Sequence, residues 1–321
     1  MKKVAIVTGA YGYIGSVLTK LLHDHNYFVY GIDNYTINKS LPYTDVNTMY
    51  NRTKYCDYYV SSDFLKMNGS MLTHEDVTVF HLAANSLLGP SAYDPLSYFK
   101  NNTAKTIELL DFLPENTKLV FASTAAVYEE AASIKTEDSK LSPPNNYGLS
   151  KLWCEQAIDA CYKIKKIKAT SFRFFNVIGA NNDTGQLKGT PHIVNKLCEA
   201  AATEQSFKIY GDDWNTRDGT CVRDYLHVID VCRALIHAAQ YIRSMQQLLQ
   251  QISTDSTLQQ YFPEAKHEFE RLNGSDQSTS KTFNELNLSI NDLGTFNGQW
   301  LGDGDQLHSY SPINGSTLGS I

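Results

Sequence analysis

The sequence predicts an α/β fold, in which a doubly wound parallel sheet carries helices on both of its faces. Short β-branched segments alternate with amphipathic segments through the first two thirds of the chain, beginning with Val4–Thr8 and Ser16–His23. Such alternation is typical of parallel strands joined by crossover helices. Two further observations narrow the class: a glycine-rich loop directly after the first strand, and a tyrosine followed four residues later by a lysine.

The later elements are expected in the same alternating order. The expected strands are Tyr27–Asp33, Val77–Ala84, Lys118–Ser123, Ala169–Val177 and Phe207–Tyr210. The expected helices are Pro95–Leu113, Tyr147–Ile164, Val194–Ala202 and one from Val228 to about Arg243. Each combines a run of apolar residues with the period of its type, two for strands and 3.6 for helices.

The composition changes near residue 240, where Gln, Ser, Asn and Thr become frequent. We therefore divide the chain into four parts: 1–180, 181–240, a polar linker at 241–284 and a last segment at 285–321. The family resemblance described below implies that the first part is a nucleotide-binding domain and the second a partial substrate lobe. The last segment carries Asn-Gly and Asp-Gly pairs between short apolar patches, and such pairs are typical of hairpin turns. The predicted fold thus ends in an irregular C-terminal tail, and the same resemblance implies that the small lobe before it is incomplete.

The overall composition is that of a soluble globular protein, with 42% hydrophobic and 19% charged residues. A formal net charge of −6 gives no reason to expect a nucleic acid or an anionic membrane surface as partner. The N-terminal apolar run is too short for a signal peptide, and no long apolar stretch follows, so we expect a cytoplasmic protein. The six cysteines show no metal-binding spacing, and no metal is expected.

The glycine-rich loop TGAYGYIG places Gly9, Gly12 and Gly15 between the first strand and the first helix. In a Rossmann-type fold these glycines permit a tight turn, a close approach of the backbone to a pyrophosphate, and close packing of helix on strand. Asp33 ends the next strand, where a carboxylate accepts hydrogen bonds from an adenosine ribose and repels a 2′-phosphate. The pattern therefore favours NAD as cofactor over NADP.

Tyr147 and Lys151 lie in YGLSK, and their spacing puts both side chains on one face of a helix. A nearby ammonium favours the ionised phenol, so we expect Lys151 to lower the pKa of Tyr147. The phenolate could then take a proton from a sugar hydroxyl while a hydride leaves the same carbon. Ser123 or Thr124, at the end of the strand FAST, is placed to hydrogen-bond the reacting oxygen.

With these motifs the chain resembles the extended short-chain dehydrogenases, and more narrowly the UDP-glucose 4-epimerase family, over about residues 1–238. Two longer segments carry the narrower resemblance: RFFNVIGA at Arg173–Ala180 and IYGDDWNTRDGTCVRDYLHVID at Ile209–Asp230. The resemblance implies NAD-dependent epimerisation at C4 of a UDP-sugar, UDP-glucose or UDP-galactose, through a transient 4-keto intermediate. It also implies a homodimer formed through the helices at Pro95–Leu113 and Tyr147–Ile164.

The resemblance also assigns roles to individual residues. It implies that the catalytic residues are Thr124, Tyr147 and Lys151. It implies that the cofactor contacts are Gly9, Gly12, Gly15, Asp33, Asp63, Asn101, Tyr147 and Lys151. Three residues match family positions that meet the substrate, and Ser123 and Thr124 complete the substrate-binding set. These three are Asn176 and Arg223 at the diphosphate and Tyr210 near the uridine.

Three departures from the family pattern leave other functions open. Ser86 stands where the family has a lysine, Glu129 where it has a glycine, and the family's C-terminal strand and arginine are missing after Ala238. The chain could therefore be a catalytically impaired remnant that binds NAD or a nucleotide sugar. Another nucleotide-sugar epimerase or a dehydratase is a second alternative, although a dehydratase would have an acidic pair at Ala125 and Ala126.

The segment at 285–321 shows a different resemblance. Its pattern GTFNGQWLGDGDQLHSYSPINGS is similar to the N-terminal segment of antiquitin-type aldehyde dehydrogenases. The segment includes neither the nucleophilic cysteine nor the general-base glutamate of those enzymes, so no aldehyde oxidation is expected. We interpret the chain as a chimera of a truncated epimerase and this opening segment, the alternative being a divergent epimerase lobe.

Overall fold

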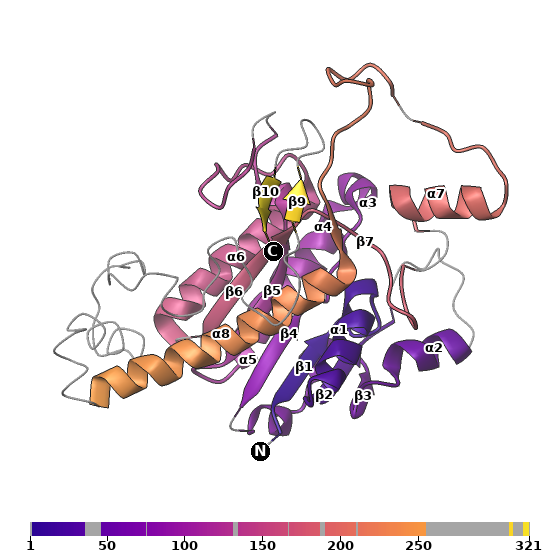
Figure 1. Cartoon of the computed structure of the whole chain (residues 1–321). Coiled ribbons are helices and arrows are strands. Elements are labelled where there is room, and N and C mark those ends of the chain that lie inside the picture. The colour runs from indigo at the N-terminus through magenta and orange to yellow at the C-terminus, as the bar shows by residue number, and fades with distance from the viewer. Residues whose placement is uncertain are drawn as a thin grey trace. The chain divides into compact units, whose positions relative to one another are not determined.

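The computed structural model describes residues 2–35, 46–74, 76–130, 134–165, 167–186, 190–209, 211–254, 308–310 and 317–320. The chain divides into one compact unit at Met1–Ala239 and a second at Gln240–Ile321. Strands and helices alternate through the first unit (Figure 1). The predicted subdivision of this unit at residue 180 stays a prediction.

A six-stranded parallel sheet forms the centre of the first unit, in the order β3-β2-β1-β4-β5-β6. Its strands are β1 (Val4–Thr8), β2 (Phe28–Asp33), β3 (Tyr58–Ser61), β4 (Val77–His81), β5 (Lys118–Thr124) and β6 (Lys168–Phe174). This arrangement confirms the predicted doubly wound parallel sheet. The strand order reverses between β1 and β4, the place where open α/β sheets bind their ligands.

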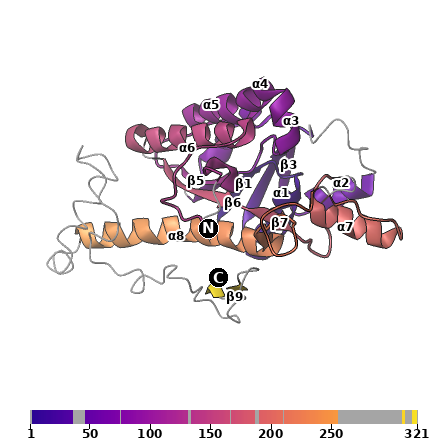
Figure 2. The same cartoon turned by 90° about the horizontal axis from the view of Figure 1, so that it is seen from above.

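Helices cover both faces of the sheet (Figure 2). The α-helices of the described residues are α1 (Tyr13–Asp24), α2 (Val46–Thr53), α3 (Leu88–Tyr93), α4 (Pro95–Tyr98), α5 (Lys105–Phe112), α6 (Asn146–Lys165), α7 (Ile193–Ala202) and α8 (Val228–Thr254). Helices α4, α5 and α6 lie on one face, and α1 lies on the other with the first turns of α8 (Figure 2). There the Cys232 thiol of α8 donates to the carbonyl of Ile14 in α1.

The core follows from strands that are apolar on both sides. Every residue of β1, β4 and β5 is buried, as expected of a parallel sheet that helices cover on both faces. A cluster of buried side chains lies between the sheet and the helices α5 and α6, and it includes Leu109, Phe121 and Ile158. This packing fixes the carboxyl ends of β1, β4 and β5 relative to one another.

Three elements differ from the sequence prediction. The helix predicted at Pro95–Leu113 contains a π-helical turn at Phe99–Ala104 between α4 and α5. The strand predicted at Ala169–Val177 is broken at Phe175, after which β7 (Asn176–Ile178) pairs in parallel with β8 (Tyr225–His227). The strand predicted at Phe207–Tyr210 is wrong for residues 207–209, which are irregular, and Tyr210 lies outside the described residues.

Described by itself, the second unit holds the end of α8 and two short strands. Helix α8 continues through Thr254, so the beginning of the predicted polar linker is helical. Strands β9 (His308–Tyr310) and β10 (Thr317–Ser320) pair antiparallel, as the predicted hairpin requires. The other residues of 285–321 lie outside the described part, and the resemblance to aldehyde dehydrogenases stays a prediction. Among the described helices, none is long and apolar enough to cross a membrane.

Candidate active site

The glycine-rich loop lies at the carboxyl end of β1 and leads directly into α1. Gly9 has φ +74°, and a Cβ there would lie 2.8 Å from the amide nitrogen of Ala83. A Cβ on Gly15 would lie 2.1 Å from the carbonyl oxygen of Gly9. Gly12 precedes the first residue of α1, and a Cβ there would lie 3.0 Å from the same oxygen. Only glycines allow this tight cradle at a helix N-terminus, which suits a pyrophosphate.

Asp33, the last residue of β2, faces this loop. Its carboxylate accepts hydrogen bonds from the backbone amide of Tyr11 at 3.0 Å and from that of Tyr35 at 2.9 Å. Burial raises the pKa of Asp33, and the backbone donors oppose that effect. Each carboxylate oxygen keeps further acceptor capacity, as contact with ribose hydroxyls would require.

Asp63 and Asn101, both predicted to contact the cofactor, are brought together by a lysine that the sequence analysis missed. The Lys105 ammonium donates to the Asp63 carboxylate and, at 3.3 Å, to the side-chain oxygen of Asn101. Burial raises the pKa of Asp63, but the bonds from Lys105 and from the amide of Leu65 outweigh it, so the pKa lies below its ordinary value. The cation thus fixes two polar side chains from distant segments beside the sheet.

Tyr147 and Thr124 meet where α6 begins and β5 ends. Tyr147 is the second residue of α6, and Thr124 is the last residue of β5. Burial raises the pKa of the Tyr147 phenol to about 12, although a hydrogen bond with the Thr124 hydroxyl favours the phenolate. The ring of Tyr98 packs edge-on against Tyr147 with centroids 6.3 Å apart. The structure therefore joins the predicted base to the predicted hydroxyl partner.

Lys151 lies one helical turn further along α6, but its ammonium does not act on the phenol as predicted. It donates to the carbonyl of Ala122 at 2.7 Å and lies 4.6 Å from the centre of the Phe121 ring. Burial lowers the pKa of Lys151 to about 8. A buried ammonium requires an acceptor, and the carbonyl of β5 provides one. The prediction that Lys151 lowers the pKa of Tyr147 is therefore wrong for this structure, in which burial raises that pKa.

Ser123 belongs to a different group of contacts from Thr124. Its hydroxyl donates to the buried carboxylate of Glu155, which also accepts two bonds at 3.2 Å and one at 2.7 Å from Arg173. Arg173 also donates to the Tyr128 hydroxyl at 3.0 Å. The structure thus places Ser123 in an ion-pair network that links β5, α6 and β6, and its predicted substrate contact stays a prediction.

Glu155 and Arg173 are the polar residues of this region that the sequence analysis did not single out. A signal existed for Glu155, because it follows Tyr147 and Lys151 at the same four-residue spacing and hence lies on the same face of α6. Arg173 begins the segment RFFNV, and only the pairing of β5 with β6 shows that it lies beside Ser123.

The predicted substrate residues lie around β7 and β8. The side-chain amide of Asn176 donates to the carbonyl of Asp224 at 3.0 Å, and its backbone amide donates to the same oxygen at 3.2 Å. This double contact brings Asn176 next to the segment that contains Arg223. Arg223 is exposed, and its guanidinium donates to the carbonyl of Val222 at 2.8 Å. Tyr210 lies outside the described residues.

Two of the departures from the family pattern are also visible. Ser86 is exposed in the segment after β4. Glu129 pairs with Lys140 at 2.8 Å beside the bridge between Tyr128 and Leu141. The glutamate thus forms a surface ion pair next to this bridge in the segment that follows β5.

His81 occupies the end of β4 between two threonines. Its ring nitrogens lie 2.7 Å from the Thr8 hydroxyl and 2.9 Å from the Thr106 hydroxyl. Complete burial lowers the pKa of His81 to about 3, so the ring is neutral near pH 7. The ring is thus packed next to Thr8, the last residue of β1 before the glycine loop.

Strand order, glycine loop and the Thr124–Tyr147–Lys151 group define a Rossmann-fold enzyme of the short-chain dehydrogenase class. The model of the NAD dependent epimerase/dehydratase family matches residues 5–249, and the chain belongs to this family. The family is NAD-dependent, which confirms the predicted cofactor, and the fit of the glycine cradle and Asp33 agrees with it.

Individual relatives agree with this assignment. The chain is 34% identical to a UDP-glucose 4-epimerase of Corynebacterium glutamicum over 73% of this chain and 70% of that protein. It is 35% identical to a UDP-glucose 4-epimerase of Lacticaseibacillus casei over 74% of this chain and 72% of that protein. A structure of the Stenotrophomonas maltophila enzyme with bound NAD and formylated UDP-arabinopyranose has a TM-score of 0.67 at 30% identity, covering 76% of this chain and 75% of that one. The structure of the Brucella ovis UDP-glucose 4-epimerase in complex with NAD has a TM-score of 0.66 at 29% identity. The match covers 75% of this chain and 74% of that one.

Proposed function

We propose that this chain interconverts UDP-glucose and UDP-galactose by epimerisation at C4 of the sugar. The observation that carries the proposal is the meeting of Thr124 and Tyr147 at the carboxyl end of β5, in a fold whose glycine loop lies at the switch point of the same sheet. The named relatives support the choice of substrate class. The exposed Arg223 and the positioned Asn176 supply donors suited to a diphosphate.

The chain's own residues supply the proton chemistry. Tyr147 takes the proton of the sugar hydroxyl and later returns it to the oxygen on the same carbon. Thr124 holds that oxygen next to the phenol. Lys151 is the cation on the same helix face, and movement of its ammonium from the Ala122 carbonyl toward the phenol would favour the phenolate. Bound NAD would supply reversible hydride transfer at that same carbon.

The residues that would hold NAD are those around the glycine loop. Gly9, Gly12 and Gly15 leave room for the pyrophosphate against the start of α1, and Asp33 would accept bonds from the adenosine ribose. Asp63 and Asn101, fixed by Lys105, complete the proposed contacts.

The dehydratase alternative is disfavoured by the turn after β5. Ala125 and Ala126 follow Thr124 in a short helical turn, and neither can donate or accept a proton through its side chain. The second alternative is a protein that binds NAD or a nucleotide sugar without catalysis. It is supported by the absence, after Ala238, of the family's C-terminal strand and arginine. Both alternatives remain as outcomes of the experiment.

The decisive experiment incubates the purified full chain with NAD and UDP-galactose and separates the products by chromatography. The proposal expects UDP-glucose, approaching the equilibrium ratio from either substrate. NAD binding without any UDP-glucose would leave only the binding function, and a product lacking one water would identify a dehydratase.

We further propose a cytoplasmic homodimer. The outer sides of α4, α5 and α6 carry exposed apolar side chains, and Phe99 and Trp153 pack together there with ring centres 4.9 Å apart. Leu96, Ile107 and Ile164 are likewise exposed, as expected of an isologous helical contact. The six cysteines are free thiols, which agrees with a reducing compartment. Light scattering of the purified chain would show twice the chain mass.

A further inference from the structure

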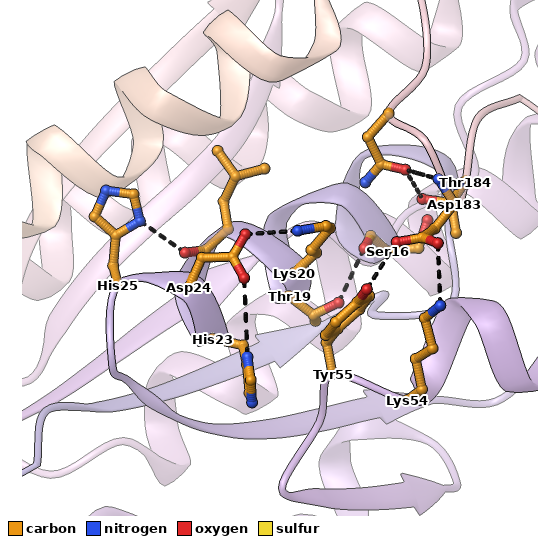
Figure 3. Close-up of polar contacts among 12 residues, drawn as sticks. Ser16, Thr19, Lys20, His23, Asp24, His25, Lys54, Tyr55, Asp183 and Thr184 are labelled. Atoms are coloured by element: carbon orange, nitrogen blue, oxygen red, sulfur yellow. Dashed lines mark hydrogen bonds and ion pairs between the residues drawn. The ribbon is translucent and has the colours of Figure 1, made fainter.

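The loop that follows β7, residues 179–186, is held by side chains from the nucleotide-binding part of the first unit (Figure 3). The Tyr55 hydroxyl donates to one oxygen of Asp183 at 2.7 Å, and the Lys54 ammonium donates to the other at 3.1 Å. The Tyr13 hydroxyl donates to the carbonyl of Gly179 at 2.6 Å. These contacts join segments that are more than a hundred residues apart in the sequence.

Within the 179–186 loop, the backbone is fixed by its own hydrogen bonds. The Asn181 side-chain oxygen accepts from the amides of Asp183 at 2.8 Å and Thr184 at 2.6 Å, and Ala180 forms a bridge with Gly185. The loop therefore responds as one piece when one of its anchors is moved.

Arg52 connects the same loop to the cofactor cradle. It is 3% exposed, and one of its nitrogens donates to the carbonyl of Tyr11 at 2.9 Å and to the Ser16 hydroxyl at 3.3 Å. Its other terminal nitrogen donates to the carbonyl of Gly185. The planar guanidinium fork meets both segments at once, which a lysine could not do.

We propose that Arg52, Tyr55 and Asp183 are positioning residues that set the 179–186 loop, and with it Asn176, relative to the glycine loop. The inference rests on the proposed function and adds to it a device that determines the affinity for the nucleotide diphosphate. The hydrogen bond from the Tyr55 hydroxyl to Asp183 acts on the substrate side, because it ends on the 179–186 loop. The Tyr55 ring also meets His23 and Lys20 of α1, and Tyr55→Phe keeps that ring. Arg52 acts on both sides, because its contacts end on both loops.

The first test compares Asp183→Asn and Tyr55→Phe with Asp24→Asn. Asp24 forms an ion pair with Lys20 at 2.6 Å and serves as the matched control, since its own partners, Lys20 and His23, both belong to α1 (Figure 3). Asp24→Asn leaves the contact between Lys20 and the Tyr55 ring in place. We expect Asp183→Asn and Tyr55→Phe to raise the KM for UDP-galactose and the Kd for UDP by about 3- to 10-fold, the effect of losing one partly exposed hydrogen bond. The kcat, the Kd for NAD and the melting temperature should stay near the wild-type values, and Asp24→Asn should change none of these quantities.

The second test uses Arg52→Lys, which keeps the charge but cannot reach both loops. We expect it to weaken the binding of both UDP and NAD, whereas the two variants of the loop contact weaken only that of UDP. Wild-type affinity for UDP in both Asp183→Asn and Tyr55→Phe would overturn the inference. So would equal losses in kcat, NAD affinity and melting temperature, because those would indicate a general structural role.

Calorimetric titration with UDP separates this inference from the proposed function. A wild-type chain that binds UDP but produces no UDP-glucose would overturn the epimerase activity and leave the positioning role to be decided by the variants. A wild-type chain that binds no UDP would overturn both.

Discussion

The Tyr147 hydroxyl is the group on which the proposed proton transfer depends. Replacing Tyr147 with Phe keeps the ring that packs against Tyr98 but removes the proton acceptor. We expect kcat to fall by about 10²- to 10⁴-fold, the usual contribution of a positioned acid–base group, while NAD still binds. A coupled assay for UDP-glucose, together with NAD titration, measures both quantities.

Tyr98 provides the control for this substitution. The Tyr98 hydroxyl donates to the carbonyl of Leu87, whereas the Thr124 hydroxyl bonds to Tyr147. Tyr98→Phe should therefore retain most of the activity. Undiminished turnover in Tyr147→Phe would contradict the mechanism.

Lys151 makes the folded state sensitive to pH in a predictable direction. Its pKa falls from the ordinary 10.5 to about 8 on burial, so between these pH values the unfolded chain holds a proton that the folded chain has released. The free energy of unfolding should therefore rise as the pH increases from about 8 to 10.5. Below pH 8 the burial of the charged form costs about 3 kcal/mol relative to the neutral amine at the same position.

The variant Lys151→Met tests this consequence of the lysine. Without NAD, the variant should unfold at a higher urea concentration than the wild type at pH 7, and the difference should shrink at pH 9.5. The variant should also lose epimerase activity, because a residue that an active site needs for function often lowers the stability of the fold. A variant that is less stable at pH 7 would show that the ammonium stabilises the fold.

Among the elements, β5, β6 and α6 depend on the ion pair of Glu155 and Arg173. Glu155→Gln leaves a partly buried guanidinium without its counter-charge, and we expect a loss of about 3 kcal/mol in the free energy of unfolding. The double variant Glu155→Leu with Arg173→Met should recover part of that loss, because both desolvated charges are then gone. Urea unfolding of the wild type, Glu155→Leu, Arg173→Met and the double variant measures the coupling.

Glu129 and Lys140 form the matched surface pair for this comparison. Both side chains are solvated, with 39% and 71% of their surface exposed, so Glu129→Gln should shift the urea midpoint little. Equal effects of Glu129→Gln and Glu155→Gln would contradict the assignment of a buried network. Additive effects of the two single changes at Glu155 and Arg173 would do the same.

Sequence patterns predict best those elements whose own residues form a continuous apolar run or a clear periodicity. β1, β4 and β5 are continuous apolar runs, and the structure forms them within a few residues of the expected bounds. β3 was missed because the edge strand Tyr58–Ser61 is short and its outer residues are exposed, which removes the apolar run. Phe207–Tyr210 was overpredicted because a short apolar run does not specify a pairing partner.

The candidate site divides in the same way. The glycine loop, Asp33 and the Tyr147 group follow from local spacing, and the structure places all of them at the carboxyl edge of the sheet. Arg52 could not be predicted, because one of its acceptors, Gly185, lies 133 positions along the chain. Lys151 shows a further limit of sequence-based prediction. Helical spacing predicts the helix face on which a side chain lies, but not the acceptor to which it donates, which here is the carbonyl of Ala122.

For the whole molecule, the change in composition near residue 240 and the division after Ala239 fall at the same place. The family model nevertheless reaches residue 249, into the part of α8 that belongs to the second unit. Helix α8 is thus common to both units, and its first turns are buried through Val231, Leu235 and Ile236. A substitution in those turns should act on the first unit's stability.

Because the cofactor cradle belongs to the first unit alone, NAD should stabilise the protein whatever the second unit contributes. At a hundredfold excess over its Kd, a ligand that binds only the folded state adds about 2.7 kcal/mol to the free energy of unfolding. For a unit of this size that corresponds to an increase of about 5 to 10 °C in the melting temperature. Differential scanning fluorimetry with increasing NAD measures the shift.

NADP is the control that makes the melting experiment specific. Its 2′-phosphate would lie against the Asp33 carboxylate, whose oxygens are fixed by the amides of Tyr11 and Tyr35 and cannot turn away. The repulsion between the two anions should leave NADP with a much smaller shift at the same concentration. Asp33→Asn should reduce the difference between the cofactors, because the amide no longer repels the phosphate. Equal shifts with NAD and NADP in the wild type would show that Asp33 does not contact the adenosine ribose.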